Sequence, residues 1–209
     1  MGAAAQPPVQ WGETPRGGRL GASLASLSRR MRAWTGRQPS AAPQGLPALP
    51  LALRRGELAE RYLAAEHATD HPAAAAAAEA ALGKAMAEAA WWPADVWGHR
   101  SLWHFEQADM ELDAVRAARR IGDVRTAGGD PTSARRYYAE AISEGRDLGA
   151  EREEGLAALG MGYAEMELGD VTTARRLAQI AIDLLERSGA PADEVTSART
   201  LRGDEKEVS

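Results

Sequence analysis

Residues 111–150, ELDAVRAARRIGDVRTAGGDPTSARRYYAEAISEGRDLGA, and residues 151–190, EREEGLAALGMGYAEMELGDVTTARRLAQIAIDLLERSGA, are two versions of one pattern. Aligned so that position 111 falls on position 151, they share 14 identical positions. The identities fall mainly on small and turn-forming residues, for example Gly122/Gly162, Gly129/Gly169 and Asp130/Asp170. A fixed period of roughly 20 to 50 residues indicates stacked units that bury their apolar faces against one another. The sequence therefore predicts a repeat architecture for this half of the chain.

Each copy is expected to form two helices joined by a Gly-Asp turn. The predicted helices cover residues 114–127, 131–147, 151–168 and 171–187. In each turn a glycine can take a positive φ to end the first helix, and the following aspartate can cap the second. Three earlier helices are predicted over 51–69, 72–91 and 94–111. No segment alternates with period two, so no strand is expected.

The order of small and large residues within each copy resembles the tetratricopeptide repeat. The residues that carry the resemblance are Ala118, Ile121-Gly122, Ala134, Tyr138 and Ala141, and then Ala158, Met161-Gly162, Ala174, Ala178 and Ala181. Gly or Ala where two helices cross lets the backbones approach, and a larger residue fills the space beside them. The 40-residue spacing is similar to the longer repeats found beside bacterial regulatory domains. The resemblance covers about 111–190 and implies an all-α, right-handed stack of antiparallel helical hairpins. Whether 72–110 forms a third repeat is left open.

Members of this family usually bind peptides or proteins against the first helix of each unit and are not catalytic. The resemblance implies a partner-binding groove lined by Arg116, Arg119, Arg120, Asp123, Leu156, Leu159, Tyr163 and Met166. The three arginines share one helix face, where they can clamp carboxylates. The alternative is a solvated face on which they pair with Glu111 and Asp113.

The helix 171–187 carries apolar side chains over an arc of roughly 200°, wider than the usual stripe of a surface helix. The segment 191–201 is predicted to be a short cap helix, followed by a disordered acidic tail to residue 209. Either this segment covers the wide apolar face, or the face contacts a partner or another copy of the chain. We expect partial exposure, with self-association through Leu177, Ile180 and Leu184.

The N-terminal part of the chain is basic, whereas the rest is acidic. Residues 1–55 hold eight arginines and one acid, a charge of +7, and the remainder has a charge of −12. Residues 1–50 are predicted to be disordered apart from an amphipathic helix over 19–34, with Leu20, Leu24, Leu27, Met31 and Trp34 on one face. The basic stretch 19–37 is compatible with an anionic membrane, nucleic acid, a partner helix or a transit peptide. The favoured interpretation is a disordered tail or a helix folded back on the acidic body.

No catalytic, cofactor or metal site is expected. The chain has no cysteine, which excludes disulfides and thiolate sites. His67 and His71 flank a predicted helix break, and His99 and His104 diverge on one helix, so neither pair predicts a metal site. No phosphate-binding loop is present.

An aromatic cluster is formed by Trp97, Trp103 and Phe105, close to Trp91 and Trp92. We expect it to be packed core or a seam between helices, together with His104. An exposed part of this cluster would instead be a contact for a partner, because Trp concentrates interface energy.

Together these features predict a non-catalytic, cytoplasmic adaptor or regulatory scaffold that binds a protein or peptide. The lack of a long apolar run and of a signal peptide favours the cytoplasm, and the Arg- and Ala-rich composition is typical of a bacterial source. The alternatives are the sensing portion of a bacterial transcription regulator and, less favoured, an enzyme with an unrecognised site.

Overall fold

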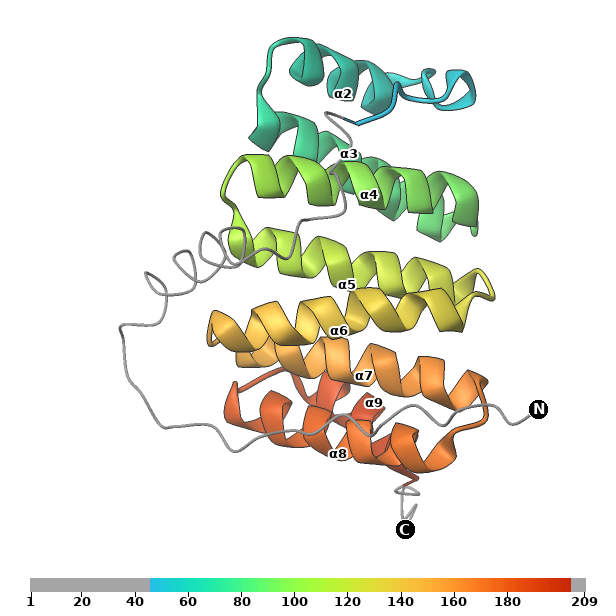
Figure 1. Cartoon of the computed structure of the whole chain (residues 1–209), viewed down its shortest axis with the longest axis vertical. Helices are drawn as coiled ribbons and strands as arrows, with labels where there is room; N and C mark the ends of the chain where they lie inside the picture. The colour runs from blue at the N-terminus through green and yellow to red at the C-terminus, as the bar shows by residue number, and fades with distance from the viewer. Residues whose placement is uncertain (1–45, 204–209) are drawn as a thin grey trace, which may run out of the picture.

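The computed structural model describes residues 46–203, and all regular structure in that range is helical. The elements are η1 (Leu51–Leu53), α2 (Glu57–His67), α3 (His71–Ala87), α4 (Trp91–Gln107), α5 (Glu111–Ala127), α6 (Pro131–Asp147), α7 (Glu151–Glu167), α8 (Val171–Arg187) and α9 (Ala192–Arg202). Successive helices pack against each other along the long axis of the molecule (Figure 1). The predicted all-α helical stack is confirmed.

Several expectations concern residues outside the described range. These are the amphipathic helix 19–34, the contacts assigned to 19–37, the disorder before residue 46 and the acidic tail. Within the range, however, the predicted disordered region extends too far. Leu49 is only 2 % exposed and belongs to the core beneath α2, α3 and α4. The ordered part therefore begins before the predicted boundary at residue 51.

The repeat continues further toward the N-terminus than the sequence identities indicate. The six helices from α3 to α8 have the same length, and their first residues are His71, Trp91, Glu111, Pro131, Glu151 and Val171. The helix starts are therefore evenly spaced, and 71–110 has the same helix–turn–helix arrangement as the two later units. The predicted helices 72–91 and 94–111 are each displaced by up to four residues at their C-terminal ends.

The turns explain this displacement. Each turn places one residue with positive φ one position before the N-cap of the next helix, or two positions before it in the turn that leads to α9. Glycine occupies this position in the later turns, at Gly129, Gly149, Gly169 and Gly189, whereas the earlier turns use Thr69, Ala89 and Asp109. Because these three residues are not glycine, no local sequence signal marks where the earlier helices end.

Replacing Ala89 with glycine is expected to raise the free energy of unfolding by about 0.5–1 kcal/mol. An alanine in the left-handed region costs about 1–2 kcal/mol, which exceeds the extra backbone entropy that glycine brings to the unfolded state. Ala89 is exposed, with a φ of 52°. Urea denaturation would measure the change. In the matched control, Ala80→Gly on the exposed side of α3, stability should instead fall by a similar amount.

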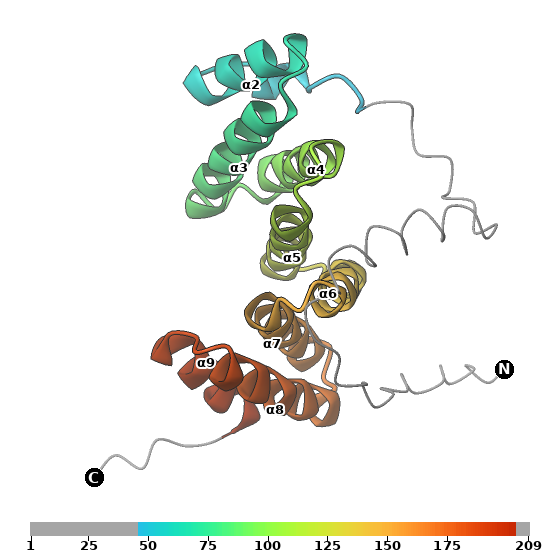
Figure 2. The ribbon, with the colours of Figure 1, turned by 90° about the vertical axis from the view of Figure 1, so that its left-hand side faces the viewer.

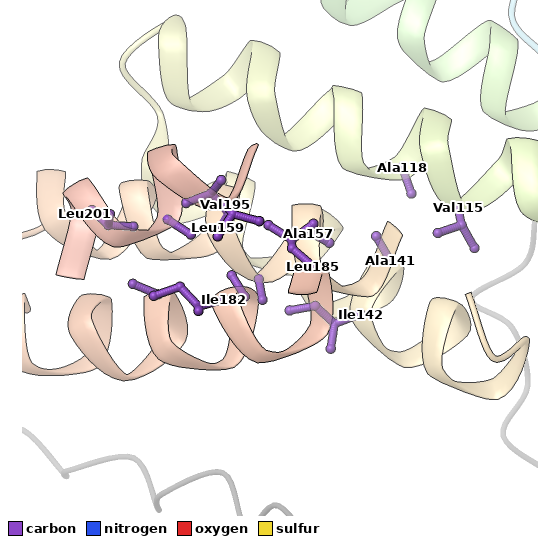
Figure 3. Close-up of a cluster of buried hydrophobic side chains, with 14 residues drawn as sticks. Val115, Ala118, Ala141, Ile142, Ala157, Leu159, Ile182, Leu185, Val195 and Leu201 are labelled. Carbon is purple, nitrogen blue, oxygen red and sulfur yellow. The ribbon is translucent and has the colours of Figure 1, made fainter. Parts of the chain in front are cut away.

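The largest apolar cluster joins α5 to α9 and is built mainly from Ala, Leu, Ile and Val (Figure 3). Helix α9 contributes Val195, Ala198 and Leu201, which lie over the side chains of α7 and α8. The wide apolar arc of α8 is thus buried from two sides, because α7 and α9 both pack on it.

This packing corrects the predicted association surface. Leu177 and Leu184 are 2 % and 6 % exposed, so they belong to the core and cannot meet a second copy of the folded chain. Ile180 is partly buried against the same cluster. Of the two alternatives, the cap over 191–201 is the one that the structure contains.

Candidate partner-binding groove

The odd-numbered helices share one side of the stack. Besides its neighbours in sequence, α7 packs against both α5 and α9, as the edge-on view of the stack helps to follow (Figure 2). On this side lies a cleft of about 460 Å3, which we call the odd-helix groove. Its lining comes from α3, α5, α7 and α9: Glu79, Arg116, Arg119, Arg120, Arg152, Glu153, Leu156 and Glu194. The groove therefore crosses all four odd-numbered helices.

Arginine–glutamate pairs connect these helices across the groove. Arg120 of α5 pairs with Glu79 of α3. The Nε atom of Arg116 donates to Glu153 of α7 at 2.8 Å, and that of Arg152 donates to Glu194 of α9 at 3.0 Å. The groove lining thus has four guanidinium groups and three carboxylates.

Glu153 is the most buried acid of this set, because its side chain is only 7 % exposed. Its hydrogen bond with Arg116 raises the pKa of the Arg116 guanidinium, and Arg119 approaches Glu153 at 4.0 Å. A buried carboxylate is tolerated when it is paired and hydrogen-bonded in this way. Arg116 and Arg119 therefore both stabilise the buried carboxylate, although only Arg116 is exposed.

The structure brings half of the predicted groove residues together. Arg116, Arg119, Arg120 and Leu156 line the cleft. The alternative interpretation is correct for one pair, since Arg116 also donates to Asp113 at 3.0 Å. Arg119 likewise donates to Asp123 on its own helix, at 2.7 Å. The contacts of Arg116 with Glu153 and of Arg120 with Glu79 reach other helices, so the three arginines are not a simple solvated face.

The other four predicted residues lie elsewhere. Leu159 is 7 % exposed and sits in the core between α7, α8 and α9. Met166 packs partly buried against the same core. The carboxylate of Asp123 faces α6, where it accepts a hydrogen bond from the Tyr138 hydroxyl at 2.9 Å. Tyr163 is 41 % exposed and donates to the Ser197 carbonyl of α9 at 3.4 Å. The three residues of α7 are outside the groove lining because α7 packs on both α8 and α9, which leaves few of its side chains for the cleft.

Burial governs the pKa of the Asp123–Tyr138 pair. It raises the pKa of Asp123, although the positive charge of Arg119 and the hydrogen bond from Tyr138 act against the shift. It also raises the pKa of Tyr138, and the charge of Asp123 adds to that effect. The Tyr138 hydroxyl therefore keeps its proton near neutral pH and remains the donor to Asp123.

Four residues of the groove lining were not predicted from the sequence: Glu79, Arg152, Glu153 and Glu194. Glu79 and Glu194 belong to α3 and α9, which lie outside the two recognised units. Arg152 and Glu153 lie in the first turn of α7, one turn before the residues that the family pattern places in a groove. The signal in the sequence that could have pointed to Glu79 is the 40-residue period, because that period places α3 in the same layer as α5 and α7.

A second polar cluster is buried between α2, α3 and α4. Arg100 is 2 % exposed and donates to the Tyr62 hydroxyl at 2.9 Å and to the Pro47 carbonyl at 2.6 Å. His104 is 1 % exposed and lies 3.0 Å from both Tyr62 and His71. The expectation that His104 is part of a packed cluster is confirmed.

The aromatic residues of α4 divide between core and surface. Trp97 and Phe105 are buried, whereas Trp92 is 56 % exposed. Among residues 46–203, no cluster of three or more His, Asp or Glu side chains is arranged to hold a metal ion. Within the same range, no helix combines the length and the apolar character needed to cross a membrane.

No protein-family model matches this chain, and no curated protein sequence does so. The fold and the groove define the molecule as an all-helical repeat stack with an open, charged cleft across its odd-numbered helices.

Proposed function

We propose that this protein is a non-catalytic adaptor or scaffold that binds a segment of a partner protein in the odd-helix groove. The observation that supports the proposal is the lining itself, in which four arginines and the partly exposed Leu156 surround a cleft that crosses four helices. Such a surface offers a peptide both charged and apolar contacts over an extended length. The small-and-large residue pattern over 111–190 supports a relationship to tetratricopeptide repeats, whose members bind partners in this way.

The chemistry of the groove favours a partner segment that carries a carboxylate beside an apolar residue. The side chains of Arg116 and Arg152 are 44 % and 45 % exposed while they hold their glutamates. A guanidinium has five N–H donors, more than these contacts consume, so each can also bind a carboxylate of the partner. Leu156 of α7 lines the same cleft and supplies the apolar contact.

Selection of random peptides on the full chain would test this proposal. We expect the selected peptides to contain Asp or Glu next to an apolar residue. Their affinity should fall about 10- to 100-fold in the Arg152→Ala variant, because a charge-assisted hydrogen bond contributes about 1.5–3 kcal/mol. Arg152 is the most informative position, because its partner Glu194 is not deeply buried and the fold does not depend on the pair.

The matched control is Arg176→Ala, which removes an exposed arginine from α8, away from the groove lining. Its affinity for the same peptides should equal that of the unchanged chain. If Arg152→Ala and Arg176→Ala bind the peptides equally well, or if selection yields no binding peptide, the groove is not the binding site and the proposal is wrong.

A further inference from the structure

Helix α2 is shorter than the repeat predicts. The helices that follow it begin at His71, Trp91 and Glu111, and this even spacing places the start of the preceding helix at Leu51. Instead α2 has 11 residues and begins at Glu57. Residues 51–53 form η1, and the chain turns at Gly56, where φ is 96°. About one and a half helical turns are therefore missing from this end of the stack.

The missing turns leave a cleft of about 440 Å3 next to η1. Its walls come from the start of α2, the end of α3 and the start of α4, and the apolar side chains among them include Leu53, Leu58, Ala81, Ala85, Pro93 and Trp97. The charged residues of the lining are Arg55, Glu57, Lys84 and Glu88. Leu51, the neighbour of the lining residue Ala52, is 78 % exposed. The cleft is mainly apolar and lies beside η1, at the end of α2 from which the turns are missing.

The N-terminal part of the chain leaves the body close to this cleft. The Pro47 carbonyl accepts a hydrogen bond from buried Arg100, and the Leu49 carbonyl accepts one from the Nε atom of Arg54 at 2.6 Å. These contacts and the burial of Leu49 hold residues 46–50 against α2, α3 and α4. Whatever precedes residue 46 therefore starts at this end of the stack.

We propose that residues 20–34 of the same chain occupy this cleft and replace the missing turns of α2. The apolar residues of this segment recur at spacings of 4, 3, 4 and 3, which places them on one side of a helix: Leu20, Leu24, Leu27, Met31 and Trp34. An apolar stripe of this kind matches the lining of the cleft, and Trp34 offers a large anchor.

Chain length and charge both favour the intramolecular contact. Residues 35–45 link the segment to the body and span up to about 40 Å when extended. A short tether of this kind gives an effective concentration of roughly millimolar, so even a weak contact is populated. Residues 19–37 carry five arginines and no acid, whereas residues 46–203 carry 26 acidic and 18 basic residues. Attraction between opposite charges therefore supports docking on the body.

This contact is separate from the proposed peptide site. None of the residues that line the cleft also lines the odd-helix groove. A helical segment in the cleft would extend the stack and cover the apolar end that α2 leaves open. Failure of either proposal would leave the other unaffected.

Cross-linking in the full chain tests the docking, because the sequence has no cysteine of its own. We would combine Ser28→Cys, at the edge of the apolar stripe, with Lys84→Cys in the cleft lining, where Lys84 is 67 % exposed. A short bismaleimide at micromolar protein should join this pair within one chain at least tenfold faster than the control pair Ser28→Cys and Arg176→Cys. Adding Leu24→Asp and Leu27→Asp should slow the first reaction to the rate of the control.

Three outcomes would overturn the proposal. Equal rates for the two cysteine pairs would mean that the segment has no preferred place on the body. Covalent dimers in place of cross-linked monomers would assign the cleft to a second copy. A rate that the two aspartates leave unchanged would show that the apolar stripe makes no contact there. Circular dichroism of each variant would verify that the helices remain folded.

Discussion

Replacing Gly122 with alanine is expected to lower the free energy of unfolding by about 2–3 kcal/mol, although helix propensity alone favours alanine by about 1 kcal/mol. A Cβ at position 122 would lie 2.7–2.9 Å from three atoms of the Tyr138 ring. The ring has no room to move away, because Tyr138 is 1 % exposed and Gly160 touches it as well. Its hydroxyl is also held by Asp123. Overpacking therefore outweighs propensity.

A double-mutant cycle with Tyr138→Ala separates the two effects. Tyr138→Ala alone should cost about 3–5 kcal/mol, because it leaves a cavity and removes a hydrogen bond from Asp123. In that background Gly122→Ala should be neutral or stabilising by up to about 1 kcal/mol, because the Cβ then has space. Urea denaturation of the unchanged chain, the two single variants and the double variant gives the coupling free energy between positions 122 and 138.

Gly83 in α3 provides the control for propensity. A Cβ at position 83 would meet only the Nη2 atom of Arg120, at 3.5 Å, so Gly83→Ala should stabilise the protein in either background. An equal cost of Gly122→Ala with and without the Tyr138 ring would show that the close approach is not the cause.

The stack was predictable where the same small residues recur at the same spacing. Gly122 and Gly162 recur because both lie at helix crossings, where a Cβ would come 2.7 Å from Tyr138 and from Leu201, respectively. The first unit lacks this signal. Ala77 and Ala78 do occupy the positions that correspond to Ala117 and Ala118, but they lie within a run of alanines. Alanine fits the close helix packing at these two positions, but within a run of alanines it does not reveal the repeat.

The groove was predictable only in part, because it depends on pairs between distant helices. The arginine spacing on α5 placed Arg116, Arg119 and Arg120 on one face, and the structure agrees. Their partners Glu79 and Glu153 lie 41 and 37 residues away, and no local pattern identifies them. The prediction of an exposed apolar face on α8 was wrong for a similar reason. Whether the apolar arc of α8 is covered depends on the path of α9, which the helical period of α8 does not encode.

Lowering the pH from 7 to 4.5 is expected to reduce the free energy of unfolding by about 2–3 kcal/mol through His104. Burial, together with the charge of His71, lowers the pKa of His104 from 6.5 to about 4 in the folded protein. Between these two values the unfolded chain binds a proton at this histidine that the folded chain does not. Stability therefore falls as the pH drops through 6.5 and continues to fall until about pH 4. Burial also lowers the pKa of His99, which acts in the same direction, whereas the raised pKa of Asp123 opposes both.

Urea denaturation at several pH values between 7 and 4.5 would measure this slope for the unchanged chain and for His104→Gln. Glutamine keeps a polar group near the Tyr62 hydroxyl, 3.0 Å from the native ring, but binds no proton in this range. The variant should be less stable at pH 7 and lose most of the pH dependence. His67→Gln is the matched control, because His67 is exposed and its replacement should leave the slope unchanged.

A slope that survives in His104→Gln would assign the acid sensitivity to other groups. The site formed by Tyr62, His71 and His104 would then have to tolerate a second positive charge in the folded protein. The geometry argues against that outcome, since His71 and His104 meet through their Nδ1 atoms at 3.0 Å in a site where Arg100 already provides a positive charge.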